Sequence, residues 1–200
     1  MYIQTIDPSE ATGEIARMYE GDLKSMGMVM NATRCWSALP EAGPAAEHLL
    51  HAARDNFSLG LRAWRLIVLI AARQIPSTYC SQVYSKVLML RHGLSKEDVV
   101  AIQRDFRSAA VLTPAEVAML AYAEQVVVDA SKIGPADIEA LRAHGFTDRN
   151  IADIAFCAAH RAFVSRFFDA VGASPEASFF DPDPEFRAQM TVGKPLPVEA

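Results

Sequence analysis

One cysteine stands where a helix is expected to begin. Ser77 follows Pro76 and is a favourable N-cap residue, which places Cys80 at the third position of the next helix. Amide groups point outward at a helix start and the macrodipole is positive there, so a thiolate is stabilised. Redox proteins use a Cys-x-x-Cys pair at such a start, but here the four residues are Ser77-Thr78-Tyr79-Cys80, and a hydroxyl cannot form a disulfide. Cys80 is therefore either a one-cysteine nucleophile or redox sensor, or a small buried residue.

A second group of chemically capable side chains lies on the last long helical segment. Asp153, Cys157 and His160 recur at helical spacing, so one stripe of a helix carries all three. His160 has apolar neighbours along that helix, which indicates either a buried, hydrogen-bonded histidine or one that lines a pocket with a lowered pKa. If Cys80 packs against this stripe, a Cys80–His160 couple supplies a nucleophile and its base.

Two arginines on largely apolar segments need partners. Arg161, Ser165 and Asp169 share another stripe, and we expect a salt bridge from Arg161 to Asp169 or across a subunit interface, or else a substrate carboxylate. Arg65 either binds an anionic substrate or extends its head group to solvent. Tyr84 can donate a hydrogen bond or a proton, although an aromatic residue at helical spacing more often serves packing.

The composition excludes several classes of protein. The chain has 200 residues, 51% of them hydrophobic and 22% charged, and its net charge of −5 argues against a nucleic-acid-binding surface. Cys35, Cys80 and Cys157 are odd in number and far apart, so they predict neither a disulfide framework nor a zinc ribbon, and a reduced, cytoplasmic setting is expected. The longest apolar run, Leu66 to Ala72, is about a third of the ~20 residues that a membrane span needs. The amino-terminal residues lack the charged and apolar regions of a signal peptide.

No cofactor is expected, because neither G-x-G-x-x-G nor G-x-x-x-x-G-K-[ST] occurs. His48 and His51 form an i, i+3 pair, but their only nearby acidic neighbours are Glu47 and Asp55. We expect these four side chains at the surface and predict no metal site. The remaining candidate partners are a small-molecule substrate and further copies of the chain.

Apolar residues recur with helical period almost throughout, which predicts an all-α fold. Residues 1–173 are expected to form one helical domain of about eight helices. Residues 174–200 contain five of the eleven prolines and are expected to form an extended tail. Capping residues, glycines and prolines predict helices at about residues 8–27, 44–57, 62–74, 77–92, 95–107, 113–133, 136–143 and 147–171.

The stretch from Leu61 to Gly93 resembles the core motif of the alkylhydroperoxidase D-like, or carboxymuconolactone decarboxylase, superfamily. The shared features are an apolar helix, a cysteine at the start of the next helix and a closing Gly93-Leu94-Ser95 turn. Other segments resemble the longer, peroxidase-related branch, over about residues 9 to 180: Ala11 to Ala16, Leu112 to Glu116, Asp137 to Arg142 and Arg161 to Gly172. The resemblance implies a single-domain helical bundle that assembles as a dimer, trimer or hexamer. It also implies a thiol peroxidase activity like that of peroxiredoxins, or decarboxylase activity.

The active-site pattern of that superfamily is only partly present. In its thiol peroxidases a glutamate lies twelve residues before the first cysteine, and a histidine lies four residues after the second. Counting along this sequence, Arg65, Ser77 and Tyr84 occupy the positions of the glutamate, the first cysteine and the histidine. Only Cys80 matches, so the sequence predicts an altered thiol-peroxidase centre.

Three hypotheses follow from the resemblance and the departures from it. The first is a divergent oxidoreductase, in which the catalytic candidates are Cys80, Tyr84 and His160, and the substrate-binding candidates are Arg65, Ser77 and Arg161. The second is a cofactor-free decarboxylase or lactone-processing enzyme that acts on a small carboxylate. There His160 is the base, Arg65 or Arg161 binds the anion and Tyr84 donates the proton. The third is a non-catalytic, oligomeric binding module.

Overall fold

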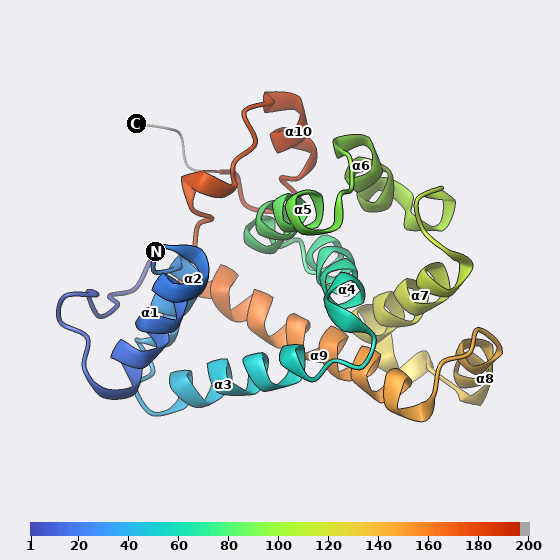
Figure 1. Ribbon diagram of the computed structural model, residues 1–200, viewed down its shortest axis with the longest axis horizontal. Helices are drawn as coiled ribbons and strands as arrows, with labels where there is room; N and C mark the ends of the chain where they lie inside the picture. The colour runs from blue at the N-terminus through green and yellow to red at the C-terminus, as the bar shows by residue number, and fades with distance from the viewer. Residues whose placement is uncertain (197–200) are drawn as a thin grey trace.

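The structure, a computed structural model, describes residues 1–196, and these residues form helices and no strand (Figure 1). The all-α prediction is therefore confirmed. The α-helices are α1 (Gly13–Met26), α2 (Asn31–Trp36), α3 (Ala42–Asp55), α4 (Gly60–Gln74), α5 (Thr78–His92), α6 (Lys96–Asp105), α7 (Pro114–Asp129), α8 (Pro135–Ala143), α9 (Asp148–Val171) and α10 (Pro184–Gln189). Three short 3-10 helices connect some of them: η1 (Phe106–Ser108), η2 (Ala130–Lys132) and η3 (Ala177–Phe179).

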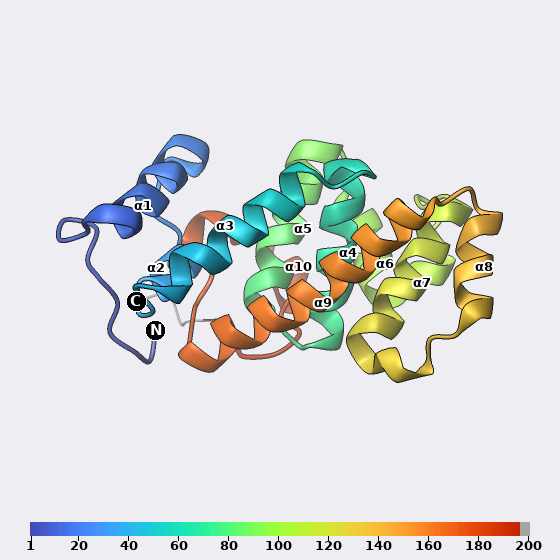
Figure 2. The same cartoon turned by 90° about the horizontal axis from the view of Figure 1, so that it is seen from below.

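Helix α4 is the central element of the fold. All of its residues from 66 to 72 are at most 1% exposed, because α5, α7 and α9 pack around it. A helix that is apolar on every side must be enclosed by its neighbours in this way. Helices α3 and α9 lie side by side on one face of the molecule, whereas α7 and α8 form the end opposite α1 (Figure 2). No helix within residues 1–196 has the length and apolar character needed to cross a membrane.

Helix boundaries follow the capping signals in the sequence. Thr113 and Glu116 form the predicted capping box at the start of α7, with the Glu116 amide 3.2 Å from Thr113 Oγ1. Gly93 ends α5 in the left-handed conformation, at φ 67°. The number of helices differs from the prediction: residues 1–196 contain ten α-helices instead of about eight. Helices α2 and α10 were not predicted, because six residues contain too few turns to reveal a helical period.

The carboxyl-terminal segment is packed onto the domain, so the prediction of an extended tail from residue 174 is wrong. The segment contains η3 and α10, and its side chains Phe179, Phe186 and Met190 are at most 7% exposed. Its prolines permit this structure because Pro184 occupies the first position of α10, where a proline is favourable, and the Asp183 carboxylate caps the helix. Residues 197–200 of the predicted tail lie outside the described chain.

The same segment binds the outer face of α5. Gln82 Nε2 donates a hydrogen bond of 2.9 Å to the carbonyl of Arg187, and the Gly193 amide donates one of 3.0 Å to Thr78 Oγ1. A side chain at position 193 would bring a Cβ to 1.9 Å from the Pro76 carbonyl oxygen, so this close approach requires glycine. The segment therefore fixes the start of the helix that carries Cys80.

Truncation of Phe186 tests whether the carboxyl-terminal segment is part of the core. We expect Phe186→Ala to lower the free energy of unfolding by about 3 kcal/mol, because the ring is 4% exposed and its removal leaves a cavity. Gln189→Ala, on the exposed side of the same helix, is the matched control and should change it by less than about 0.5 kcal/mol. Chemical denaturation measures both, and equal, small effects of the two substitutions would show that the segment does not contribute to the core.

A carboxyl group is buried between α1 and α3. Glu47 was expected at the surface but is 5% exposed, and its Oε2 atom has no hydrogen-bond partner within residues 1–196. Burial, together with the nearby Asp22 carboxylate, raises the pKa of Glu47 to about 7. His51 Nε2 lies 3.9 Å from Glu47 Oε1. Within residues 1–196, no three histidine, cysteine, aspartate or glutamate side chains are grouped so that they could hold a metal ion. The fold therefore favours the neutral, protonated form of Glu47.

Glu47 should make the protein less stable as the pH rises. Because its pKa is higher in the folded chain than the ordinary value of 4.5, its contribution is complete below about pH 4.5 and is lost as the pH passes 7. The loss amounts to about 3 kcal/mol by pH 8. Urea denaturation from pH 4.5 to 8 should show a flatter stability profile for Glu47→Gln than for the unmodified protein. Glu41→Gln, at an exposed position, should leave the slope unchanged; an unaltered slope in Glu47→Gln would contradict the assignment.

Candidate active site

Cys80 lies at the helix start that the sequence predicts. Helix α5 begins at Thr78 after the N-cap residue Ser77, whose backbone is extended, so Cys80 occupies the third helical position. The thiol is fully buried. Ser77 occupies the N-cap position, but its hydroxyl accepts no hydrogen bond from the backbone of the helix. The positive partial charge near Cys80 therefore comes from the backbone amides at the start of α5.

Two polar side chains of α9 reach the sulfur of Cys80. Ser165 Oγ lies 3.2 Å from Cys80 Sγ, and Arg161 Nη2 donates a hydrogen bond of 3.1 Å to it. Arg161 and Ser165 are one helical turn apart, so they present their polar groups on the same stripe of α9. The sequence predicts this stripe, with Asp169, a subunit interface or a substrate carboxylate as the partner of Arg161, but it does not indicate Ser165 as a site residue.

Arg161 is a buried cation without a carboxylate partner. Its side chain is 3% exposed, its Nε atom has no hydrogen-bond partner in the described chain, and the nearby groups that affect its charge are Tyr84, Cys80 and Cys157. The predicted salt bridge with Asp169 is absent, because Asp169 lies two turns further along α9. Burial alone would lower the pKa of Arg161, but the three neighbouring groups outweigh burial and raise it. The guanidinium stays charged, and Cys80 is the acidic group that contacts it.

Tyr84 and Arg65 continue the site away from Cys80. Tyr84 lies one turn beyond Cys80 on α5 and is half-buried, and the guanidinium carbon of Arg161 is 5.3 Å from the centre of its ring. Arg65 of α4 is also half-buried, and its Nη1 lies 2.7 Å from Nε2 of His92 at the end of α5. Burial lowers the pKa of Arg65, and the nearby Tyr84 hydroxyl opposes that shift. The structure thus brings Cys80, Tyr84, Arg65 and Arg161 into one region, whereas His92 had no signal in the sequence.

His160 does not form the predicted couple with Cys80. Both of its ring nitrogens are buried and have no hydrogen-bond partner within residues 1–196. The ring stacks on Phe156 at 5.6 Å between centroids and meets the edge of Phe163 at 6.0 Å. Burial and the neighbouring Arg161 lower the pKa of His160 to about 4, so the imidazole is neutral at pH 7. The neighbouring position on α9 places Arg161, rather than His160, against the sulfur of Cys80.

Ser77 makes no contact that assigns it to a substrate. It is fully buried, and its hydroxyl has no hydrogen bond that meets ordinary geometry within the described chain. The carboxyl of Asp169 lies nearby: burial raises the pKa of Asp169, and the Ser77 hydroxyl opposes that shift. Ser77 therefore belongs to the packing between the start of α5 and the end of α9.

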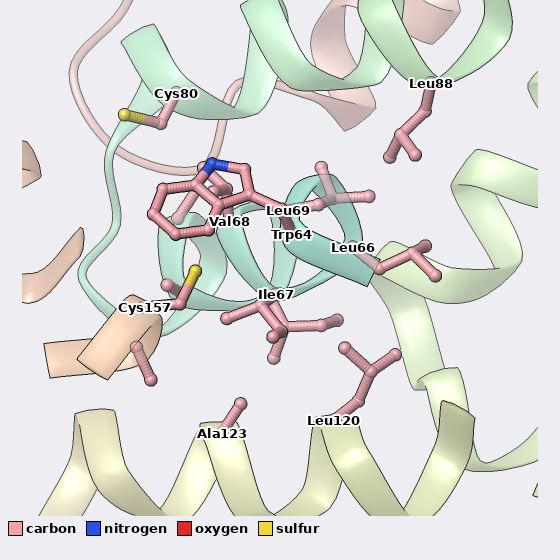
Figure 3. Packing of buried hydrophobic residues seen from close by; sticks show 14 of the residues in the cluster. Trp64, Leu66, Ile67, Val68, Leu69, Cys80, Leu88, Leu120, Ala123 and Cys157 are labelled. Carbon is pink, nitrogen blue, oxygen red and sulfur yellow. The ribbon is translucent and has the colours of Figure 1, made fainter. Parts of the chain in front are cut away.

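The other two cysteines are unsuited to join the chemistry. All three cysteines are free and buried. Cys157 on α9 belongs to the same apolar cluster as Cys80 on α5, and Trp64 lies between the two in the view of Figure 3. Burial raises the pKa of the Cys157 thiol far above its usual range, and burial raises that of Cys35 to about 11. Cys80 is therefore the cysteine of the three whose sulfur contacts both a buried guanidinium and a buried hydroxyl.

Two surface grooves lie elsewhere, where α6 meets the carboxyl-terminal segment. One, of about 530 Å³, is lined by residues of α6 and α10 that include Lys96, Arg104 and Phe186; the other, of about 470 Å³, includes Arg73 and Met190. Neither is lined by a predicted site residue. Cys80 is fully buried in this conformation, and Tyr84, one turn further along α5, is half-buried.

The comparisons with known proteins identify the fold. No protein-family model matches the chain, and no curated protein matches its sequence. Among solved structures, an uncharacterized peroxidase-related protein from Ralstonia eutropha JMP134, described as an alkylhydroperoxidase AhpD core, is 22% identical with a TM-score of 0.83. The match covers 90% of this chain and 94% of that one. A second uncharacterized peroxidase-related protein, from Silicibacter sp. TM1040, is also 22% identical, with a TM-score of 0.77 over 88% of this chain and 93% of that one.

The debrominase Bmp8 is a third similar structure. It is 18% identical with a TM-score of 0.74, over 93% of this chain and 96% of that one. A variant of Bmp8 with a cysteine replaced by alanine has been solved in complex with 2,3,4-tribromopyrrole, and it matches with a TM-score of 0.75. These similarities extend over nearly the whole length of each protein. The chain therefore has the all-α alkylhydroperoxidase AhpD-like fold, as the resemblance of its sequence implied.

Proposed function

We propose that the protein is a thiol-dependent oxidoreductase in which Cys80 is the nucleophile and the substrate is a small molecule with an electrophilic atom, foremost a hydroperoxide. The observation that carries this proposal is the 3.1 Å contact between Arg161 Nη2 and Cys80 Sγ in a fully buried setting. A buried guanidinium without an anion is strongly unfavourable, so the thiolate of Cys80 serves as its counterion. The start of α5 adds a further stabilisation of the negative sulfur.

The same side chains suit the reduction of a hydroperoxide. The thiolate attacks the distal oxygen, an S–O bond forms, the O–O bond breaks, and the leaving alkoxide takes up a proton to become an alcohol. Arg161 and Ser165 can donate hydrogen bonds to the peroxide oxygens as charge moves onto them. The product on the protein is the sulfenic acid of Cys80.

Regeneration of Cys80 requires a thiol from outside the site. Ser77 cannot form a disulfide, and burial keeps Cys157 protonated. One molecule of a small thiol displaces water from the sulfenic acid to give a mixed disulfide, and a second releases the Cys80 thiolate and a disulfide. The proposal therefore includes an external, low-molecular-weight thiol as the reductant.

Reductive removal of a halogen is the second candidate, and the similarity to the debrominase Bmp8 favours it. In that reaction the thiolate attacks bromine, an S–Br bond forms, the C–Br bond breaks, and the electron pair left on carbon takes a proton, for which Tyr84 is the proposed donor. Two molecules of external thiol then release bromide and restore the thiolate. The decarboxylase hypothesis is less well supported, because its proposed base, His160, is enclosed by aromatic rings and apart from Cys80.

Oxidation of Cys80 by a hydroperoxide tests the first candidate. We expect cumene hydroperoxide to convert Cys80 to a sulfenic acid, trapped with dimedone and located by mass spectrometry. Arg161→Met should slow this step about 100-fold, because it removes both the counterion of the thiolate and a donor to the leaving oxygen. Cys157→Ala, which removes the other buried thiol of this region, should keep the rate. Equal rates in Arg161→Met and the unmodified protein would contradict the proposal, provided that circular dichroism shows both are folded.

Bromide release separates the two candidates. With a brominated pyrrole and a reducing thiol, the second candidate predicts bromide in step with debrominated product, and Cys80→Ser should abolish both. Tyr84→Phe should slow bromide release about 10-fold, because the carbanion loses its proton donor, but should leave peroxide reduction within about 2-fold. Peroxide turnover without bromide release assigns the first candidate alone. The absence of both reactions in the folded protein would overturn both candidates and leave the decarboxylase and non-catalytic hypotheses.

A further inference from the structure

Positive charge is concentrated next to Tyr84, on the more exposed side of the site. Arg65 lies there with His92, and the ionisable groups that affect its charge are Tyr84, Arg91 and Arg54. Arg62 lies close enough to affect His92. These cations come from three different helices, α3, α4 and α5, so the fold, and not one basic stretch of sequence, assembles them. Such a concentration is unexpected in a chain whose net charge is −5.

The cations of this cluster differ in how they are neutralised. Arg62 forms an ion pair of 2.8 Å with Glu116, and Arg54 forms one of 2.7 Å with the adjacent Asp55. Arg65 instead contacts the imidazole of His92, and none of the groups that affect its charge is a carboxylate. Burial, Arg65 and Arg62 all lower the pKa of His92, so the ring is neutral at pH 7 and leaves the charge of Arg65 in place. Arg65 is thus the half-buried cation at this site that the described chain does not neutralise.

We infer that the substrate of Cys80 is a small anion, of the carboxylate class, and that Arg65, oriented by His92, is the residue that selects it. The inference rests on the proposed function of Cys80 and adds the charge of its substrate. Arg161 lies on the buried side of Tyr84 and contacts the sulfur, whereas Arg65 lies on the more exposed side. A substrate that enters past Tyr84 can therefore place its carboxylate on Arg65 while its electrophilic end meets Cys80. Arginine binds a carboxylate through two parallel hydrogen bonds, which also fixes the orientation of the substrate.

The electrostatics of the site require such a residue if the substrate is anionic. A negative molecule that approaches a thiolate is repelled, and the repulsion is strong where water is excluded. A cluster of cations at the approach reverses the sign of the local potential and raises the concentration of anions there. Arg161 is engaged by the sulfur itself and Arg91 is exposed to solvent, so Arg65 is the half-buried charge that remains for the substrate.

Alkylation by a matched pair of reagents tests the inference without relying on turnover. Iodoacetate and iodoacetamide have nearly the same size and react in the same way: the thiolate forms a C–S bond, the C–I bond breaks and iodide leaves. They differ in that iodoacetate carries a negative charge. The rate of modification of Cys80 by each reagent is measured by mass spectrometry at pH 7 and low salt, with 2-mercaptoethanol as an uncharged reference thiol.

We expect the ratio of the iodoacetate rate to the iodoacetamide rate to be at least about 10-fold higher for Cys80 than for 2-mercaptoethanol. Arg65→Met should bring the ratio down to that of the reference thiol, whereas Arg65→Lys should keep most of the preference because it retains the charge. Arg73→Met, also half-buried on α4 but beside the groove next to α6, should leave the ratio unchanged. The preference of the unmodified protein should fall as salt is raised from 0.01 to 1 M.

The outcomes distinguish the inference from the proposed function. Reaction of Cys80 with both reagents at the ratio of the reference thiol overturns the anionic substrate but retains a nucleophilic Cys80. A high ratio that persists in Arg65→Met overturns the role of Arg65. No reaction with either reagent, under conditions in which the denatured protein is modified fully, overturns the proposed nucleophile and the inference with it.

Discussion

The charge of Arg161 is the constraint on which the rest of the site depends. The guanidinium is 3% exposed and contacts no carboxylate of the described chain, yet its neighbours keep it protonated. An unpaired charge in a dry interior costs several kcal/mol, so the groups around it must supply negative charge or hydrogen bonds. Cys80 Sγ at 3.1 Å and the ring of Tyr84 at 5.3 Å are those groups. The contact between Arg161 and Cys80 therefore ties the packing of α9 against α5 to the charge of the guanidinium.

Helix α5 can hold this pair in place because its two faces have different partners. Thr78 and Gln82, one turn apart, bind the carboxyl-terminal segment on the outer face, whereas Cys80 points to α9. The close approach of Gly193 to the Pro76 carbonyl leaves the start of α5 little freedom to move. Helix α4, whose residues 66–72 are enclosed on every side, provides the surface on which both α5 and α9 pack. A thiol that is rigidly positioned beside its counterion needs little reorganisation before it reacts.

The sequence predicts features that depend on residues close together in the chain, and it misses contacts between residues that are far apart in the chain. Cys80 at the third helical position follows from Ser77 and Pro76, its neighbours in the chain, and the order of helices follows from periodicity and capping residues. The partner of Arg161 lies 81 residues away, and no local period reports such a contact. The sequence therefore suggests only Asp169 on the same helix, a subunit interface or a substrate carboxylate as its partner. Five prolines favour an extended segment from residue 174, and nothing local shows that Pro184 instead begins a helix. The sequence places Glu47 at the surface by default, whereas the fold buries it and raises its pKa.

The departures from the superfamily pattern make chemical sense together with Arg161. Counted along the sequence, Arg65, Ser77 and Tyr84 stand where the thiol peroxidases that the sequence resembles have a glutamate, the first cysteine of the pair and a histidine. A thiolate that is held as the counterion of a buried guanidinium needs no base to remove its proton, so the loss of a histidine relay does not remove its reactivity. An arginine in place of a carboxylate at position 65 also makes the local charge positive instead of negative, which favours the approach of anionic molecules. In the proposed function, activation by fixed charge thus takes the place of activation by proton transfer, and because Ser77 cannot form a disulfide, an external thiol is part of the catalytic cycle.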